Sequence, residues 1–282
     1  MPGLNSTGEP RTSDYNLGRG KVYFSELTDS LPVEWRDLGN APELVVSVET
    51  EKLEHKSSRE GLKLVDLEVV VSQKVSIRLV LDELNFENMA LFFSGAASSR
   101  TNDGGDSISG AANVAVVTQG RWYDLYADAA GMPTSDIQAS RIYDIGEVTI
   151  TPTAGGSALV EGTDYDVDLD LGRIFVIEGG DMTAGSYDVD VAANVTAVAN
   201  VQQVRVLTGS SVVGALKFVA VNPADANKFV EYNFHQVRLA AEGDLPLITD
   251  EWATLPLTGT AERNVVADPN SPILTIVTHP QA

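Results

Sequence analysis

Segments in which apolar and polar residues alternate one by one constrain the fold of this chain more than any other feature. Such alternation is found at residues 74–81, 44–48 and 230–235. Because successive side chains of a strand point to opposite faces, each segment is predicted to be a strand with one buried face. The apolar run at residues 217–221 fits a strand that is buried more fully. We therefore expect a chain that is mainly β.

One segment follows the period of an α-helix instead. Asn85 is suited to cap the N-terminus, Glu87 lies in the first turn where the helix dipole favours an acid, and Gly95 is placed to end the helix with a positive φ. The expected buried face consists of Phe86, Met89, Ala90 and Phe93. We expect this face to pack on a sheet and to bind no ligand. Residues 94–110, which are small and polar, are expected to form a mobile loop.

Charge is distributed unevenly along the chain. The formal net charge is −21, which argues against binding driven by attraction to nucleic-acid phosphates or to an anionic membrane. Residues 81–200 contain 19 of the 40 acids but only 4 of the 19 bases. This shift predicts an acidic β-rich domain inserted into a more balanced host domain, and we place the insert at residues 144–196. Residues 1–143 and 197–282 would be the two parts of the host domain, which begins with a flexible arm at residues 1–18.

Several classes of chemistry lack the residues that they need. Cysteine is absent, so disulfides, thiolate metal sites and cysteine nucleophiles are excluded. The three histidines form no zinc-binding pair, and no nucleophile-elbow sequence occurs. The sequence has neither a signal segment nor a run of about 20 apolar residues. We therefore expect a product that is soluble and intracellular when made, that is not an enzyme, and that has no catalytic residue, metal site or cofactor.

Alternate aspartates form the segment most suggestive of ligand binding. The four residues are Asp164, Asp166, Asp168 and Asp170. In an extended strand they would share one face, with residues 174–177 returning as a second strand. The opposite face would consist of Tyr165, Val167, Leu169 and Leu171. A calcium loop of the EF-hand type needs glycine and glutamate where this chain has Leu171 and Ile177. A solvated acidic strand is therefore favoured, and a shared cation is the open alternative.

Several motifs resemble those of one protein family. They are residues 16–24 (NLGRGKVYF), 35–40 (WRDLGN), 54–61 (EHKSSREG) and 242–259 (EGDLPLITDEWATLPLTG). Together they are similar to the first and last parts of the major tail tube proteins of tailed bacteriophages. The hairpin motif at residues 163–174 is similar to a module inserted in some members of that family.

This resemblance implies a fold, an assembly and a set of partners. Each subunit would be an all-β chain with one flanking α-helix, a tail-tube-type β-sandwich with a small β-rich inserted domain. Six copies would form a ring whose inner strands join into one barrel, and the rings would stack into a tube. The tape measure protein would occupy the lumen during assembly, and the tail terminator and the tail tip or baseplate proteins would bind the tube. The subunit would be made in the host bacterial cytoplasm, would bind no membrane itself, and would reside in the virion tail.

One segment is expected to connect neighbouring rings. By the resemblance, residues 49–61 form a long loop that reaches the adjacent ring, and their interleaved acids and bases let two copies meet with complementary signs. The contact residues would be Glu49, Glu51, Lys52, Glu54, Lys56, Arg59 and Glu60. A freely solvated hairpin explains the same mixture of charges.

A second set of acids is expected to line the bore. Double-stranded DNA passes without specific binding only if the bore offers no fixed cations that trap its phosphates. The candidates for lining it are Asp66, Glu68, Asp82 and Glu83. The four alternate aspartates of the insert are instead expected on the outer surface, in a like-charged coat that keeps tubes apart.

Two other functions fit parts of the sequence. An acidic β-rich surface or adhesion module would bind a ligand through the insert, with or without calcium, although the missing signal segment argues against it. A capsid decoration protein or a tail terminator would be a virion component that forms no tube. Electron micrographs separate the three, since they predict stacked rings or tubes, monomers, and single closed rings.

Overall fold

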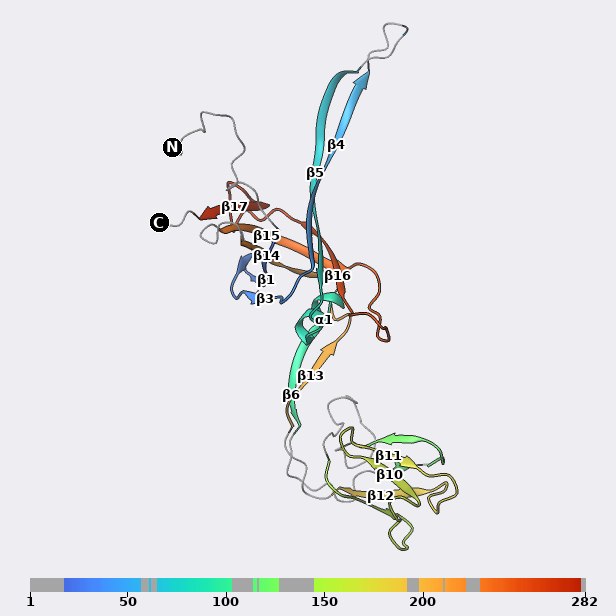
Figure 1. The fold of residues 1–282 in the computed structure, drawn as a ribbon. Helices are drawn as coiled ribbons and strands as arrows, with labels where there is room; N and C mark the ends of the chain where they lie inside the picture. The colour runs from blue at the N-terminus through green and yellow to red at the C-terminus, as the bar shows by residue number, and fades with distance from the viewer. Residues whose placement is uncertain are drawn as a thin grey trace. The chain divides into compact units, whose positions relative to one another are not determined.

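A computed structural model describes residues 18–56, 61, 65–102, 114–115, 117–126, 145–191, 198–209, 211–221 and 229–279. The chain divides into two compact units (Figure 1). The larger unit comprises residues 1–98 and 204–282, and the smaller unit comprises residues 99–203. The arm expected at residues 1–18 lies outside the described residues, apart from Gly18.

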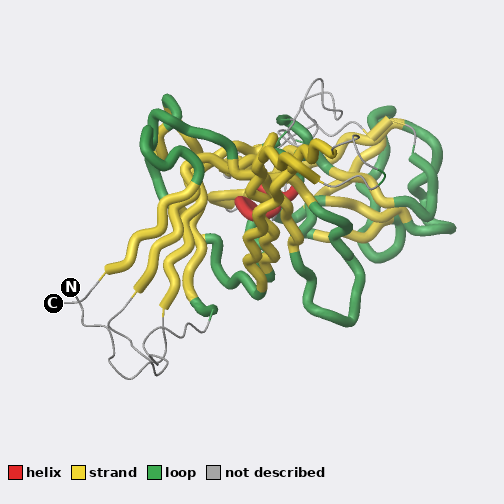
Figure 2. The backbone as a smooth tube through the Cα atoms, turned by 90° about the horizontal axis from the view of Figure 1, so that it is seen from above, coloured by secondary structure: helices red, strands yellow, loops and turns green. Residues whose placement is uncertain are grey.

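The larger unit is built on one antiparallel sheet, whose strands are yellow in Figure 2. Its nine strands are β1 (Gly20–Thr28), β2 (Leu31–Pro32), β3 (Arg36–Asp37), β4 (Glu43–Lys56), β5 (Val65–Leu81), β14 (Val212–Val221), β15 (Phe229–Ala241), β16 (Leu255–Ala261) and β17 (Leu274–His279). They lie in the order β2-β1-β14-β15-β16-β5-β4, while β3 pairs with β1 and β17 with β15. The sheet is open and is not a closed barrel. The prediction of a mainly β chain, with a single helix in the described part, is confirmed.

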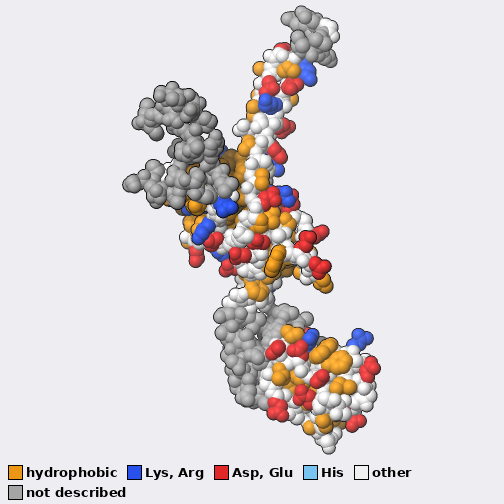
Figure 3. All heavy atoms as spheres, viewed as in Figure 1, with side chains coloured by type: hydrophobic (Ala, Val, Ile, Leu, Met, Phe, Trp, Pro, Cys, Tyr) orange, Lys and Arg blue, Asp and Glu red, His pale blue; other side chains and the backbone are white. Residues whose placement is uncertain are grey.

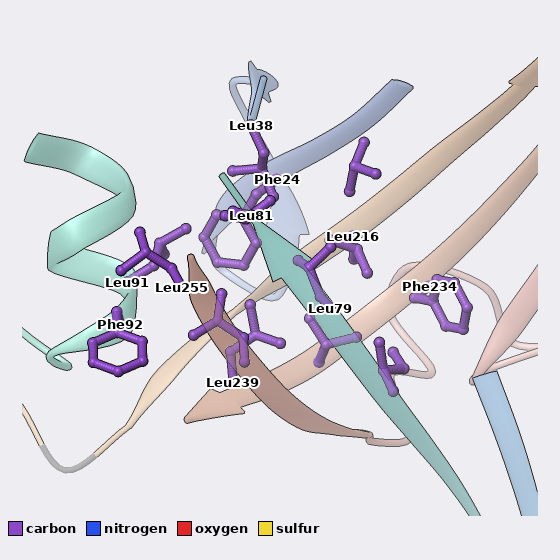
Figure 4. Packing of buried hydrophobic residues seen from close by; sticks show 14 of the residues in the cluster. Phe24, Leu38, Leu79, Leu81, Leu91, Phe92, Leu216, Phe234, Leu239 and Leu255 are labelled. Atoms are coloured by element: carbon purple, nitrogen blue, oxygen red, sulfur yellow. The ribbon is translucent and has the colours of Figure 1, made fainter. Parts of the chain in front are cut away.

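The core of the larger unit follows the predicted alternation. Ile77, Leu79 and Leu81 of β5 are buried, and so are Leu216 of β14 and Phe234 of β15. Figure 4 shows side chains from these strands meeting those of the helix. Burial of such side chains is the main favourable term in folding. The strands predicted at residues 74–81, 217–221 and 230–235 are therefore confirmed, but the fuller burial expected at 217–221 is wrong, because only Ala220 of that run is buried and Val221 is 45% exposed.

The predicted strand at residues 44–48 is confirmed as part of β4, but its expected burial is wrong. Val46 and Val48 are 40% and 65% exposed. The reason lies in the pairing of the neighbouring strand, since β16 pairs with β5 only from Leu81 to Val75. The outer part of the β4–β5 pair continues beyond the core, so neither of its faces is covered.

Helix α1 (Phe86–Phe92) begins as predicted, because the side chain of Asn85 accepts a hydrogen bond from the backbone N–H of Asn88 at 2.8 Å. Asn88 itself is fully buried. Its amide donates to the carbonyl oxygens of Leu38 and Glu83, and its Oδ1 accepts from Arg36 Nη1 at 2.7 Å. These bonds fix the helix against the segment between β3 and β4.

The predicted buried face of the helix is only partly right, since Met89 and Phe93 are half-buried and Phe93 packs against the core. Ala90 is buried, but Phe86 is 37% exposed, and Leu91 and Phe92 supply the main apolar contacts. Both point toward Leu239 and Leu255 of the sheet in Figure 4. The buried polar side chain of Asn88 turns a different face of this short helix inward than the apolar period indicates.

The segment after the helix also differs from the prediction. Residues 94–110 were expected to be a loop, yet β6 (Ala96–Asn102) pairs with β13 (Val198–Arg205). Residues 103–110 lie outside the described residues. The positive φ expected at Gly95 occurs at Ser94, where φ is 47°. Glycine is required at position 95 for space, because a Cβ there would collide with the carbonyl oxygen of Arg205.

The smaller unit has two three-stranded sheets and a core of its own. The sheets are β10 (Tyr165–Asp168), β11 (Arg173–Val176) and β8 (Trp122–Asp124), and β7 (Val114–Ala115), β12 (Ser186–Val191) and β9 (Val148–Pro152). Six of its core side chains have no exposed surface: Leu125, Ile150, Ile174, Val176, Met182 and Val189. The boundaries expected at residues 144–196 are too narrow, because β8 and β7 precede them in sequence and pair with β11 and β12.

Candidate assembly surface

The β4–β5 hairpin is the most distinctive surface feature of the larger unit. Its strands pair from Glu43 and Val80 to Lys56 and Val65, and β4 ends the described sheet. Beyond Val75 no other described strand pairs with β5. Figure 1 shows the two strands extending well past the rest of the sheet. Both outer edges of the hairpin therefore present backbone groups that can pair with another chain.

The outer hairpin is exposed on both faces. Every residue from Val45 to Lys56 on β4 and from Val65 to Lys74 on β5 is exposed. The large apolar side chains among them are Val45, Val46, Val48, Leu53, Val65, Leu67, Val69, Val70 and Val71. In Figure 3, apolar, acidic and basic side chains alternate along this part of the molecule. A two-stranded hairpin without a core is at best marginally stable in water, so these strands gain stability when another surface covers them.

The structure brings together members of the two predicted sets of site residues. Lys52, expected at the ring contact, lies with its Nζ 2.5 Å from Oε1 of Glu68, expected in the lumen. This hydrogen bond raises the pKa of Lys52. His55 Nδ1 lies 2.6 Å from Asp66 Oδ1 in the same way. Asp66 and Glu68 are therefore residues of the hairpin, where Glu68 pairs with a lysine and Asp66 contacts a histidine.

Other contact residues lie on the same hairpin. Lys56 Nζ is 3.4 Å from Glu54 Oε2, and Ser72 Oγ donates to Glu51 Oε2 at 2.9 Å. Glu49 faces Lys74 in the register. Each of these pairs is exposed, and exposed ion pairs contribute about 0–1 kcal/mol, too little to hold the hairpin alone. Arg59 and Glu60, which were also predicted, lie outside the described residues.

Asp82 and Glu83 lie elsewhere, at the opposite end of β5. The backbone N–H of Asn40 donates to Glu83 Oε1 at 3.0 Å, and the Asn40 side-chain amide donates to Asp82 Oδ2 at 2.5 Å. Both carboxylates therefore anchor the segment between β3 and β4. The four lumen candidates do not form one group, because β5 separates the first two from the last two along its length.

The four alternate aspartates do not share one face, so this prediction is wrong. Asp164 is buried and accepts backbone hydrogen bonds from Val160 at 2.8 Å and Asp181 at 2.7 Å, which lower its pKa. Asp168 accepts from the N–H of Leu171 and from the guanidinium of Arg173, and these bonds lower its pKa too.

The reason is the length of the strand. β10 ends at Asp168, so Asp170 lies in the following turn, where Gly172 has a φ of 58°. Leu169 and Leu171, which were expected on the apolar face, are 45% and 42% exposed in that turn. Among the described residues no three His, Cys, Asp or Glu side chains are arranged to hold a metal ion.

An open groove of about 990 Å³ lies between β1, α1 and the start of β14. Its one arginine, Arg36, is already engaged, with its Nε 3.3 Å from Glu87 Oε2 and its Nη1 bonded to Asn88. Burial lowers the pKa of Arg36. The groove is further lined by the acids Glu26 and Glu34, so it disfavours anionic ligands.

Sequence reasoning missed the loop between β15 and β16. Leu247, Ile248 and Trp252 of this loop are 87%, 98% and 95% exposed. The sequence pattern of this segment follows neither the period of a strand nor that of a helix, so it predicted no exposed apolar cluster there. The segment entered the sequence analysis only as a motif similar to those of tail tube proteins. The available signal was a group of large apolar residues among prolines and aspartates, where a turn would ordinarily be polar.

One family model matches most of the chain. The model of a family described as "Protein of unknown function UCP028589" matches residues 15–272. None of the curated proteins matches the chain. The part of the chain that is described contains no helix of the length and apolar character needed to cross a membrane.

Proposed function

The chain belongs to this family of unknown function, UCP028589, and we propose that it is a structural virion protein that assembles into the tail tube of a tailed bacteriophage. Six copies form a ring, and the rings stack into a conduit for delivery of double-stranded DNA into the host. The tape measure protein, the tail terminator and the tail tip or baseplate proteins are its partners. The chain performs no catalysis in this role.

The observation that carries the proposal is the exposed β4–β5 hairpin. Its apolar side chains lie in water on strands that have no core beneath them. A monomer gains nothing from such a surface, whereas a neighbouring copy that covers it removes apolar area from water at about 25 cal/mol per Å². The hairpin therefore supports a function in which copies of the chain contact one another.

The open sheet supports the same proposal. β4 has 14 residues and forms one end of the sheet, and among the described strands its outer edge is unpaired. Long unpaired edges invite pairing with another chain, and closing several sheets into one barrel removes them. A ring of copies joined edge to edge is thus a state in which this sheet has no exposed edge.

The net charge of −21 fits a conduit for DNA. A polyanion passes an acidic or neutral wall without being trapped, whereas fixed cations would bind its phosphates. Asp82 and Glu83 are the better candidates for such a wall, because Asp66 and Glu68 already pair with His55 and Lys52 in the hairpin.

Electron microscopy of the purified full chain tests the proposal. We expect stacked rings or tubes over a range of protein and salt concentrations. A protein that remains monomeric at every concentration contradicts tube assembly, and single closed rings would indicate a tail terminator or decoration protein.

An acidic adhesion module is the second candidate, and an aromatic surface on the smaller unit favours it. Trp122 is 49% exposed and lies opposite Phe175, with ring centroids 5.1 Å apart. The guanidinium of Arg173 lies 4.4 Å from the Trp122 ring. Exposed aromatic clusters of this kind mark binding surfaces. Calorimetry with calcium tests the calcium form of this function, since heat at millimolar calcium would support it and none would remove it.

A further inference from the structure

The loop between β15 and β16 is the most exposed apolar surface in the described chain. Leu247, Ile248 and Trp252 are each at least 87% exposed, and they lie within six residues of one another. No strand or helix of the described part includes them. Scattered exposed apolar residues are ordinary, but a cluster this exposed marks a surface that a partner covers.

The register of the sheet puts this loop far from the hairpin tip. Leu255, just after the loop, pairs with Leu81 at one end of β5, and Lys56 pairs with Val65 at the other end. At about 3.3 Å per residue, the 17 residues of β5 separate the two ends by about 50 Å. The loop of one copy therefore cannot contact the tip of its own hairpin.

The tip of the hairpin offers a matching surface. Leu53 pairs with Val69, and His55 pairs with Leu67 two residues further on, so the register puts these four side chains on one face. Leu53, Leu67 and Val69 are 67%, 58% and 49% exposed. The larger unit thus carries one apolar cluster at each end of the same strand.

We propose that the loop of one copy is the receptor for the hairpin tip of the next copy, with Leu247, Ile248 and Trp252 packing against Leu53, Leu67 and Val69. This inference rests on the proposed self-assembly and names the surface that receives the hairpin. Because the two clusters lie at opposite ends of one strand, the contact is head-to-tail. A head-to-tail contact that does not close produces an open filament, as a tube of stacked rings requires.

Bases near the hairpin tip can pair with the acids of the loop, although the same part of the hairpin also carries Glu54, Asp66 and Glu68. Residues 243–254 contain the acids Asp244, Asp250 and Glu251 and no base, and all three acids are exposed. The hairpin carries Lys52 and Lys56, whose side chains are 50% and 52% exposed and can face a second acid. The groove beside α1 is a poorer binding surface for this loop than the hairpin tip. It is lined by Glu26, Glu34 and Glu87, which would repel the acids of the loop.

Disulfide cross-linking tests the contact directly, because the chain contains no cysteine. A copy with Leu53→Cys, Leu67→Cys or Val69→Cys is mixed with a copy that carries Leu247→Cys, Ile248→Cys or Trp252→Cys, and the mixture is oxidised. A disulfide needs Cα atoms within about 7 Å, so nine combinations sample the contact. We expect covalent dimers from at least one combination, and none when Val266→Cys, which replaces a residue with 59% exposure, takes the place of the loop variant.

A mixing experiment provides an independent readout. Leu53→Ser/Leu67→Ser removes apolar side chains of the hairpin tip, and Ile248→Ser/Trp252→Ser removes apolar side chains of the loop that receives it. Each variant alone should stop at single rings, and the mixture should give stacks of two rings, since one intact tip meets one intact receptor. All four side chains are exposed, so thermal melting should match that of the unsubstituted protein.

The outcomes distinguish the inference from the proposed function. Tubes of normal length from the loop variant, with no cross-link in any of the nine mixtures, would overturn the receptor and leave tube assembly intact. An unsubstituted protein that forms neither rings nor tubes would overturn both.

Discussion

Lys52 on β4 and Glu68 on β5 form an ion pair across the hairpin although they are not register partners. Glu68 lies directly opposite Glu54, and like charges in this position destabilise a pair of strands. Lys52 binds Glu68 at 2.5 Å and Lys56 binds Glu54 at 3.4 Å, so each acid of the repelling pair has its own cation. Lys52 and Lys56 therefore offset the repulsion between Glu54 and Glu68.

Reversing these charges should block assembly. In Lys52→Glu/Lys56→Glu/Arg59→Glu the two acids lose their cations, and the contact with an acidic neighbour becomes repulsive. We expect folded protein with an unchanged thermal transition and no tubes in negative-stain micrographs. Arg19→Glu/Arg121→Glu/Arg263→Glu changes the charge by the same amount at other exposed positions and should still form tubes.

A charge swap separates the ion pair from the net charge. Lys52→Glu alone should shorten or weaken the tubes, and adding Glu68→Lys should restore them, because the swap re-forms the pair and removes the repulsion between Glu54 and position 68. Tubes of normal length in the triple charge-reversal variant would show that the hairpin is simply solvated.

Asn88→Ala should destabilise the larger unit strongly. The substitution removes the donor to the carbonyl oxygens of Leu38 and Glu83 and the acceptor of Arg36 Nη1, while Arg36 keeps only its ion pair with Glu87. Leaving such groups unsatisfied costs about 3 kcal/mol. Asn85→Ala, which removes only the N-cap of the same helix, should cost about 1 kcal/mol. Urea unfolding compares the two, and equal losses would contradict the role of Asn88.

The smaller unit should lose stability in acid because of Asp164. Hydrogen bonds from the backbone lower the pKa of this carboxyl in the folded chain. The ionised carboxyl therefore contributes its full stabilisation of the folded state above the unfolded pKa of about 4. This stabilisation is lost as the pH falls from there through the lower pKa of the folded state. The protection of peptides covering residues 165–191 against hydrogen exchange, taken relative to the intrinsic exchange rate at each pH, should fall in this range.

Asp164→Asn tests whether Asp164 causes this loss of stability in acid. The amide keeps one acceptor oxygen and presents an N–H group to the other backbone donor, so exchange should already be faster at pH 7 and should depend less on pH below about 4. Asp166→Asn, at the exposed position two residues further along, should leave the exchange profile unchanged. Equal effects of the two substitutions would refute the assignment.

Gly214→Ala should disturb the pairing of β1 with β14. A Cβ at this position would collide with the ring of Phe24 and the carbonyl oxygen of Ser25. Because Phe24 is buried, its ring cannot move into solvent, and we expect a loss of about 1–3 kcal/mol in the free energy of unfolding. Gly18→Ala, where the space around the new methyl group is open, should have little effect. Thermal melting of both variants provides the comparison.

Local sequence order predicted several elements correctly. The alternation at residues 74–81 identified a strand with Ile77, Leu79 and Leu81 on its buried face, and Asn85 was identified as a helix cap. These predictions depend only on residues that lie within a few positions of each other in the sequence. The buried face of the helix could not be predicted in the same way, because it depends on bonds from Asn88 to residues as distant as Arg36.

Identical local patterns also took different roles. Asp164 and Asp166 occupy equivalent places in one alternating run. Asp164 is buried and accepts hydrogen bonds from Val160 and Asp181, whereas Asp166 is exposed. The loop with Trp252 has no period at all, so its exposure was visible only after the chain had folded.

The sequence by itself determined that this chain is built of strands, where its acids concentrate, and which positions alternate between two faces. Only the tertiary structure decided which of those faces is covered. Val46 and Val48 alternate in the same way as Ile77 and Leu79, but the first two are exposed and the last two are buried. The physical reason is that a strand's alternation arises within the strand, whereas burial requires other elements, and here the core and the pairing with β16 stop at Val75 while the hairpin continues.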